Sequence, residues 1–293
     1  MFWRSWWGKE GIGLRELHVS RVTDAVEELC KKACFELPED VTAALQRALE
    51  EEESPQGREI LKQLLENAEI ARAEQIPICQ DTGVAVVFLE IGQDVHLVGG
   101  SLKEAVDEGV RRGYVSGYLR KSVVRDPIRR ENTQDNTPAI LYTTLVPGDA
   151  VRVTVVPKGT GSENMSALKM LTPAHGPEGI RRFVVRVVEE AGANPCPPVI
   201  VGVGLGGTMD KAALMAKRAL LRPVGQPHPQ PHLAALEEDI LKAINDLGIG
   251  PQGLGGRVTA LAVHVEAYAT HIGALPVAVN LQCHAARHAS VAL

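Results

Sequence analysis

The chain has 293 residues, of which 45% are hydrophobic and 23% are charged, and its formal net charge is −5. Such a chain can bury one or two cores, and its mild negative charge argues against nucleic acid or an anionic membrane as the main partner. No apolar run is long enough to span a membrane, and five scattered cysteines do not make a secreted disulfide framework, so we expect a protein of the reducing cytoplasm.

The N-terminal part of the chain predicts a short extension followed by helices. Residues 1–13 begin with MFWRSWWGKE, which lacks the apolar core and cleavage site of a signal peptide, and we expect them to be a disordered extension. From there to about residue 75, apolar residues recur at helical spacing. They predict helices around residues 22–33, 41–49 and 60–71, the last of them entered through Ser54 and Pro55.

The middle of the chain adds strands. VAVVFLEI (84–91) predicts a strand, and Ser101 with Glu104 forms a capping box for a helix that runs to about Arg112. Two β-rich runs on either side of residues 147–149 predict a hairpin. Strands and helices then alternate, with helices at 177–191, 208–221 and 232–246 and strands at 198–203, 258–266 and 275–282.

This order of elements predicts a mixed α/β or α+β fold. A helical N-terminal layer (about 14–75) should precede mixed β-sheets with packing helices, all within a single domain over residues 14–293.

The cysteines fall into two groups. Cys30 and Cys34 lie one turn apart on an apolar helix face, which indicates buried structural thiols. Cys79, Cys196 and Cys283 stand in irregular positions at strand ends without any CxxC signature, and their spacing alone favours three unrelated core residues. If their thiolates converge, the set suits a soft metal centre, such as an iron–sulfur cluster in which one iron lacks a protein ligand.

Several loops could bind a ligand. GVGLGG (202–207) matches the GxGxxG pattern of a nicotinamide-dependent dehydrogenase, but it comes late in the chain and no acidic residue follows about twenty positions on. The arginine-rich stretch at 119–139 is either a solvated face or a clamp for a dicarboxylate. The glycine-rich stretches at 157–166 and 248–256 are either ligand loops or mobile segments.

Seven segments, in unbroken order over about residues 15 to 293, together resemble the class I iron–sulfur hydro-lyases, the oxygen-sensitive fumarases and the related L-tartrate dehydratases. The segments are CQDTG (79–83), LRKS (119–122), NTQDNTPA (132–139), KGTGSENMS (158–166), CPPVIVGVG (196–204), LGIGPQGLGG (247–256) and LQCHAARHAS (281–290). Within this family, KGTGSENMS and NTQDNTPA favour a fumarase α subunit, although Gln134 stands where a glycine is common.

The resemblance implies a hydro-lyase that reversibly hydrates fumarate to (S)-malate, with L-tartrate or another dicarboxylate such as mesaconate as the alternative substrate. It implies a [4Fe–4S] cluster with three cysteine ligands, whose remaining iron acts as a Lewis acid on the substrate. It also implies a separate β subunit that carries further catalytic residues, because the sequence stops where α subunits of this family stop. A dehydrogenase and a cluster-based redox sensor are remoter alternatives.

The resemblance also assigns roles to individual residues. Its cluster ligands are Cys79, Cys196 and Cys283. Its catalytic residues are Asp81, His271 and Arg120, and its substrate-binding residues are Gln80, Arg120, Gly161 and Lys158.

Overall fold

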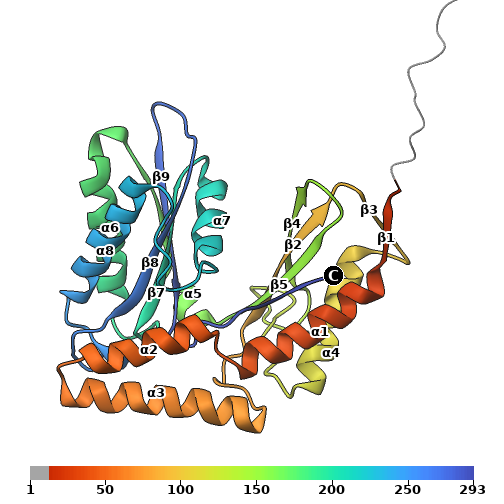
Figure 1. The fold of residues 1–293 in the computed structure, drawn as a ribbon, viewed down its shortest axis with the longest axis horizontal. Helices are drawn as coiled ribbons and strands as arrows, with labels where there is room; N and C mark the ends of the chain where they lie inside the picture. The colour runs from red at the N-terminus through yellow and green to blue at the C-terminus, as the bar shows by residue number, and fades with distance from the viewer. Residues whose placement is uncertain (1–12) are drawn as a thin grey trace, which may run out of the picture.

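The structure is a computed structural model that describes residues 13–293, and it contains two four-stranded β-sheets that lie side by side, with helices packed on them (Figure 1). The predicted mixed α/β fold is confirmed. The extension expected over residues 1–13 lies outside the described residues, apart from Gly13. Between residues 13 and 293, no helix has the length and apolar character needed to cross a membrane.

The helices and strands follow one another in this order: β1 (Arg15–His18), α1 (Val19–Phe35), α2 (Glu39–Glu51), α3 (Pro55–Glu74), β2 (Val84–Gly92), β3 (Val95–Val98), α4 (Leu102–Ser116), β4 (Ile140–Val146), β5 (Val151–Lys158), α5 (Thr160–Glu163), β6 (Ala167–Leu171), α6 (Gly176–Ala191), β7 (Val199–Gly206), α7 (Met209–Ala219), α8 (Pro231–Asn245), β8 (Ala260–Tyr268), β9 (Leu275–Gln282) and β10 (Ala289–Ala292). Short 3₁₀ turns lie at Pro173–His175 and Pro251–Gly253.

The first sheet has the strand order β10-β5-β2-β4 and is covered by α1 and α4 (Figure 1). Its core joins apolar residues of these two helices to the inward side chains of the strands, including Val22, Val106, Val87 and Val153, none of which is accessible to solvent. α4 begins at the predicted capping residue, since the Ser101 hydroxyl accepts a hydrogen bond from the backbone N–H of Glu104.

The predicted hairpin around residues 147–149 is wrong. β4 and β5 do not pair with each other but flank β2, which pairs in parallel with β4 and antiparallel with β5. β2 is buried along most of its length and takes a ladder of hydrogen bonds on both edges. The turn signal at 147–149 is real, but a local signal does not reveal that a strand from much earlier in the chain lies between the two runs.

The second sheet has the strand order β6-β9-β7-β8, with α6 and α8 on one face and α7 on the other (Figure 1). β7 is its central strand, pairing in parallel with β8 and antiparallel with β9. Its side chains are buried throughout, as expected for a strand covered on both faces.

The glycines of GVGLGG are explained by the packing of α7 on β7. A Cβ atom on Gly204 would lie 2.0 Å from the carbonyl oxygen of Ala212, and one on Gly202 would lie 2.1 Å from that of Ala216. Only glycine allows the helix backbone to approach the strand this closely. The GxGxxG match therefore has a structural cause that needs no dinucleotide.

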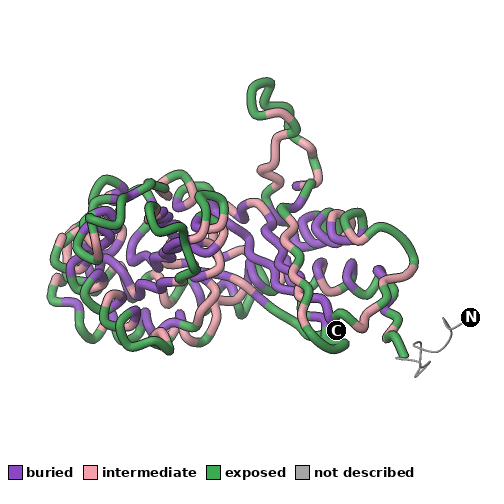
Figure 2. The backbone as a smooth tube through the Cα atoms, turned by 90° about the horizontal axis from the view of Figure 1, so that it is seen from above, coloured by how far each residue is buried: buried purple, intermediate pink, exposed green. Residues whose placement is uncertain are grey.

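Two connections hold the halves of the molecule together. α2 and α3 run along the same end of the molecule, where α2 packs against the second sheet through Leu45, Ile200 and Val258 (Figure 1). After β9 the chain crosses to the first sheet, where β10 pairs with β5. Figure 2 shows buried segments in both halves of the molecule.

Candidate functional site

The loop at 79–83, between α3 and β2, is held by buried side chains from three distant parts of the chain. The carbonyl oxygens of three successive loop residues each accept a hydrogen bond: Asp81 O from Arg287 Nη2, Thr82 O from Tyr114 Oη at 2.7 Å, and Gly83 O from Asn136 Nδ2 at 3.1 Å. None of the three donor residues is more than 2% exposed. The backbone of the loop is therefore fixed at three successive carbonyl oxygens.

The Asp81 carboxylate links this loop to the segment that follows β5. Its Oδ1 accepts the N–H of Gly83 at 3.0 Å, and its Oδ2 accepts the backbone N–H of Thr160 at 2.8 Å and the Thr160 hydroxyl at 3.2 Å. With three donors, the carboxylate has a fixed orientation.

The arginine-rich segment lies against the same loop. The Thr82 hydroxyl donates to the carbonyl oxygen of Arg120 at 3.0 Å, and Asn136 Oδ1 accepts the backbone N–H groups of Ser122 at 2.7 Å and Val123 at 3.2 Å. Arg120 itself is exposed, and within residues 13–293 its guanidinium makes no hydrogen bond or ion pair. It is therefore available to bind a carboxylate.

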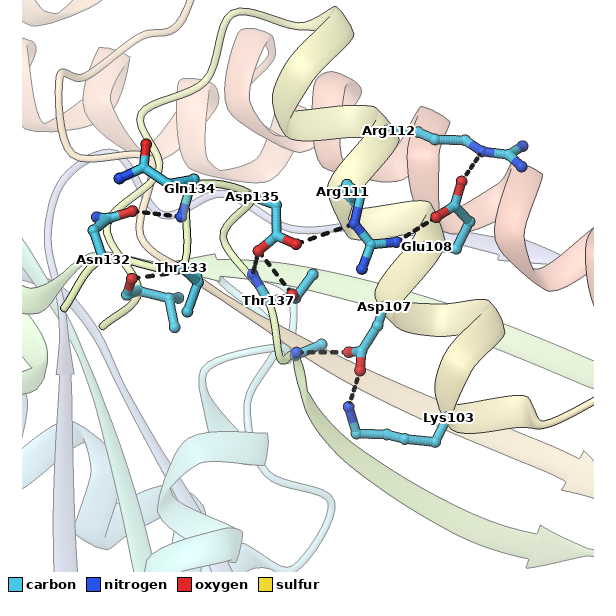
Figure 3. A network of polar contacts seen from close by, with 12 residues as sticks. Lys103, Asp107, Glu108, Arg111, Arg112, Asn132, Thr133, Gln134, Asp135 and Thr137 are labelled. Carbon is cyan, nitrogen blue, oxygen red and sulfur yellow. Dashed lines mark hydrogen bonds and ion pairs between the residues drawn. The ribbon is translucent and has the colours of Figure 1, made fainter. Parts of the chain in front are cut away.

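Residues 132–137 are fixed in turn against α4 (Figure 3). Asp135 accepts hydrogen bonds from Arg111 Nε at 3.0 Å and from the backbone N–H of Thr137 at 3.0 Å. Burial alone would raise the pKa of Asp135, but the hydrogen bonds from Thr137 and Arg111 outweigh it and lower that pKa to about 2. Gln134 has a φ of 68°, in the left-handed region that favours glycine.

Lys158 lies at the end of β5 and is 3% exposed. Its ammonium donates to the Ser162 hydroxyl at 2.8 Å and lies 3.3 Å from Glu163 Oε2. Burial lowers the pKa of Lys158 to about 8, although the charge of Glu163 acts in the opposite direction. Glu163 also accepts a hydrogen bond from Asn280 Nδ2 at 2.8 Å, which connects this segment to the end of β9. Gly161 is exposed in the short helix α5.

The loop that carries Cys196 is bound to two later loops. The Cys196 carbonyl oxygen accepts the backbone N–H of His284 at 3.3 Å and lies 3.1 Å from His284 Nδ1. Gln252 Nε2 donates to Pro197 O at 2.9 Å and lies 3.1 Å from His284 Nδ1. The glycine-rich loop at 248–256 therefore packs against both the second and the third of the cysteine loops.

The three predicted cluster cysteines lie in one region. Cys79 and Cys283 pack against the same small group of apolar residues around Ile78 and Ala285. Burial raises the pKa of the Cys196 thiol, and the thiols of Cys283 and Cys79 raise it further. Burial also raises the pKa of Cys283, and the positive charges of Arg287 and Lys158 oppose that rise.

Two neighbouring groups contact the Cys79 thiol. The backbone N–H of Asp81 donates to Cys79 Sγ at 3.4 Å, and the Cys79 thiol donates to Gln80 Oε1 at 3.4 Å. In the described part of the chain, no three His, Cys, Asp or Glu side chains are close enough together to hold a single metal ion.

The structure does not bring His271 to these loops. This residue is exposed in the turn between β8 and β9, where its Nδ1 lies 3.1 Å from the backbone N of Gly273. Cys283 follows the other end of β9, a strand of eight residues. At ~3.4 Å per residue, the two ends of such a strand are roughly 25 Å apart.

Four residues that hold the site were not singled out by the sequence: Tyr114, Asn136, Gln252 and Arg287. Asn136, Gln252 and Arg287 lie inside the conspicuous segments, so only their individual roles were missed. Tyr114 lies in α4, outside every such segment, and carried no signal.

Comparison with known proteins gives a consistent picture. The family model described as fumarate hydratase (Fumerase) matches residues 23–292. A protein of Methanocaldococcus jannaschii, provisionally named the alpha subunit of an L(+)-tartrate dehydratase, is 43% identical over 275 residues, which cover 92% of this chain and 96% of the relative. The L(+)-tartrate dehydratase subunit alpha of Escherichia coli K12 is 32% identical over 276 residues, which cover 93% of this chain and 91% of the relative.

Proposed function

The chain belongs to the class I iron–sulfur hydro-lyases, the family of fumarate hydratase, and from this we propose that it is the α subunit of an enzyme that adds water to, or removes it from, a dicarboxylate of four or five carbons. The relatives' names, each of which specifies a subunit alpha, support a separate β subunit as its partner.

L(+)-tartrate is the first candidate substrate, and its dehydration would give oxaloacetate. The names of the two relatives support it. Fumarate is the second candidate, supported by the description of the family model and by the KGTGSENMS and NTQDNTPA segments. The fumarase favoured by the sequence analysis thus has less support from the relatives than its alternative.

Cys79, Cys196 and Cys283 are the ligands that this proposal gives to a [4Fe–4S] cluster. The observation that carries it is the gathering of three thiols from distant loops into one region, beside the cationic side chains of Arg287 and Lys158. Because a cluster contains several iron atoms, each thiolate binds a different iron, and the three need not converge on one ion. When bound, the cluster supplies an iron without a protein ligand that acts as a Lewis acid on the substrate hydroxyl and carboxylate.

Arg120 and Gln80 then bind the substrate. Among residues 13–293 the guanidinium of Arg120 has no partner, so its N–H donors can make a bidentate contact with the second carboxylate, and its backbone is held by Thr82. The Gln80 amide is exposed next to Cys79. Gly161 is also exposed, beside Thr160, so its backbone N–H can face the same ligand.

Asp81 and Lys158 act at the floor of the site. The three hydrogen bonds of the Asp81 carboxylate hold the Thr160 segment against the cysteine loop, so Asp81 orients the groups around the substrate. The same carboxylate also takes part in proton transfer. Lys158 supplies a buried positive charge next to Cys283. Within one chain, β9 separates His271 from Cys283. His271 can therefore act at the site only if a second copy of this chain brings its own turn between β8 and β9 to the site.

An anaerobic assay of the complex tests this function. The chain is co-expressed with its β subunit and purified without oxygen, and L(+)-tartrate, fumarate and mesaconate are offered side by side. We expect iron and sulfide in the complex and turnover of one of these dicarboxylates. A complex that holds its cluster but turns over none of them contradicts the proposal.

The substrate clamp has a matched control in the same segment. Replacing Arg120 by lysine keeps the charge but loses the paired N–H donors of the guanidinium. KM should therefore rise roughly tenfold or more, which corresponds to a loss of about 1.4 kcal/mol of binding free energy. Arg129→Lys makes the same replacement at an exposed position that has no proposed role, and KM should not change. Equal KM values for the two variants would contradict the proposal that Arg120 binds the substrate.

A further inference from the structure

We propose that Arg287 donates N–H groups of its Nε and Nη1 to sulfur atoms of the iron–sulfur centre, and that it thereby retains the cluster and raises its reduction potential. Arg287 would be a positioning residue that acts on the cluster without touching the substrate. The inference rests on the proposed function, because it requires a cluster at Cys79, Cys196 and Cys283.

The burial of Arg287 is the first observation. Arg287 is the largest fully buried side chain among the described residues, and 2% of its surface is exposed. Its Nη2 donates to the Asp81 carbonyl oxygen. Its Nε and Nη1 are buried, and within residues 13–293 they have no hydrogen-bond partner. A buried guanidinium with two unsatisfied donors is strongly destabilising, so these donors point to a ligand.

The surroundings of Arg287 identify what kind of ligand this is. No carboxylate of the described residues forms an ion pair with it. Its ionisable neighbours are the thiols of Cys34, Cys283 and Cys79 and the hydroxyl of Tyr114. Burial raises the pKa of Cys34 to about 12 and that of Tyr114 above its usual value, so neither carries a charge at neutral pH, and the thiols of Cys283 and Cys79 are those that become negative when they bind a cluster. Thiolates, and a cluster held by them, are the anionic acceptors that this arrangement favours.

The position of Arg287 in the chain connects two of the three ligand loops. It lies four residues after Cys283, and its hydrogen bond to Asp81 O reaches the loop of Cys79. A donor fixed at both places has little freedom to move when the cluster is absent. It is therefore preorganised for the sulfur atoms of the bound cluster.

Two physical effects follow. Hydrogen bonds to the sulfur atoms of an iron–sulfur cluster stabilise the more negative, reduced state, so the potential should fall when they are removed. They also hold the ligand set together, and outer-shell partners of this kind change metal affinity by roughly 10- to 100-fold.

The molecule contains a matched control, Arg222. The Arg222 side chain is 12% exposed, and its Nε and Nη1 also have no hydrogen-bond partner among the described residues. Unlike Arg287, it has carboxylate partners, since it forms ion pairs with Glu237 and, at 3.9 Å from Nη1, with Glu266. Arg222→Lys therefore changes a largely buried guanidinium that already has its counter-charges.

The experiment uses the anaerobic complex with the β subunit, as wild type and as Arg287→Lys, Arg287→Gln and Arg222→Lys. Three quantities are measured: iron and sulfide per chain, the midpoint potential in a titration followed by electron paramagnetic resonance, and the rate at which the cluster absorbance fades in air. For Arg287→Gln we expect a lower midpoint potential and a fading rate at least roughly tenfold higher. Arg287→Lys should lie between this variant and wild type, and Arg222→Lys should match wild type.

The cluster-free chains are compared by circular dichroism and thermal unfolding. If Arg287→Gln does not fold, Arg287→Lys carries the test, because lysine keeps a charge and one donor for Asp81 O. Wild-type potential and fading rate in a folded Arg287 variant would overturn the inference, as would the unfolding of both variants, which would make Arg287 a structural clamp. A wild-type complex without any cluster defeats the proposed function itself, which is a different result from wild-type behaviour in the variants.

Discussion

Asn136 is inaccessible to solvent, and both ends of its side-chain amide are used. Its oxygen accepts two backbone N–H groups of the arginine-rich segment, and its nitrogen donates to the carbonyl of Gly83. With a φ of 62°, it also occupies a backbone conformation that asparagine tolerates better than most residues. One side chain thus fixes the distance between the proposed substrate clamp and the first cysteine loop.

Replacing Asn136 by alanine should destabilise the chain by about 2–4 kcal/mol, because the backbone N–H groups of Ser122 and Val123 lose their acceptor and the Gly83 carbonyl keeps only its 3.3 Å contact with Tyr114 Oη. Urea unfolding of the cluster-free chain measures the change. Asn132→Ala is the control within the same segment, since Asn132 is exposed and its hydrogen bonds can be replaced by water. We expect a loss of about 1 kcal/mol or less there. Equal losses at the two positions would show that burial of the amide does not matter.

Gln134 carries backbone strain that a glycine would avoid. A non-glycine residue in the left-handed region costs about 1–2 kcal/mol, of which glycine's greater freedom in the unfolded chain offsets a part. Gln134→Gly should therefore raise the free energy of unfolding by about 0.5–1 kcal/mol. Gln134→Ala removes the same side chain but keeps the strain, so it should bring no gain. Identical thermal midpoints for the two variants would contradict the explanation.

At the scale of elements, the junction between α2 and α3 is anchored by one carboxylate. Glu52 is 1% exposed and accepts the backbone N–H groups of Ser54, Arg257 and Val258, each at 2.9 Å. It therefore ties the end of one helix and the start of another to the strand region that follows the glycine-rich loop. Burial alone would raise the pKa of Glu52, but these hydrogen bonds outweigh it and lower that pKa below its usual value of 4.5.

Because the folded chain lowers this pKa, Glu52 stabilises the fold above about pH 4.5, and that contribution is lost as the pH falls through its lower folded pKa. Glu52→Gln should lower the free energy of unfolding by about 2–3 kcal/mol at pH 7, and the difference from wild type should shrink below pH 4.5. Urea unfolding at both pH values measures this. Glu53→Gln is the neighbouring control, since its ion pair with Arg257 is exposed and should contribute about 1 kcal/mol or less. A Glu52→Gln penalty that stays constant with pH would contradict the assignment.

Elements whose signals are local could be predicted from the sequence. Ser54 and Ser101 begin α3 and α4 as expected, because a capping hydroxyl acts within three residues of itself. Pairing between strands is not local. β2 lies beside β5 because its side chains are apolar enough for a central, buried strand that pairs on both edges. Nothing in the turn at 147–149 encodes that pairing. Strands of four or five residues, such as β1, β3, β6 and β10, are too short to show a period and were not predicted.

At the scale of the whole molecule, two sheets with separate hydrophobic cores are joined where the chain crosses from β9 to β10. The strand after Cys283 pairs with β5 of the first sheet, whereas β9 before it belongs to the second. The site loops come from both halves, and their hydrogen bonds cross between them through Asp81, Glu163 and Arg287. This supports the proposal that residues 14–293 behave as one domain.

One domain should unfold in one step. Val153→Ala weakens the core of the first sheet and Val201→Ala weakens that of the second, each by about 1–3 kcal/mol. In hydrogen exchange followed by mass spectrometry, each variant should lower the protection of slowly exchanging amides in both sheets by the same free energy. If each variant affects only its own sheet, the chain consists of two domains.

The site could be predicted as a set of segments but not as an arrangement. The glycine, asparagine and cysteine patterns mark the loops that meet, because those residues are needed where backbones turn or bind. The residues that hold the loops in place, Tyr114 and Arg287, look like ordinary members of a helix and a loop until the fold brings them under the cysteine loop. Cys283 follows His271 by twelve positions, which suggests that the two residues lie close together in space. The straight strand β9 between them instead places them far apart.

The crossing of the chain from the second sheet back to the first has a consequence for biosynthesis. While the ribosome is still translating the region of β8, β5 has already emerged with one edge bare, since the strand that will cover it is encoded more than a hundred codons later. A bare edge of this kind readily pairs with a neighbouring nascent chain. We therefore expect the growing polypeptide to depend on a holding chaperone, and iron delivery to wait until synthesis has passed β10.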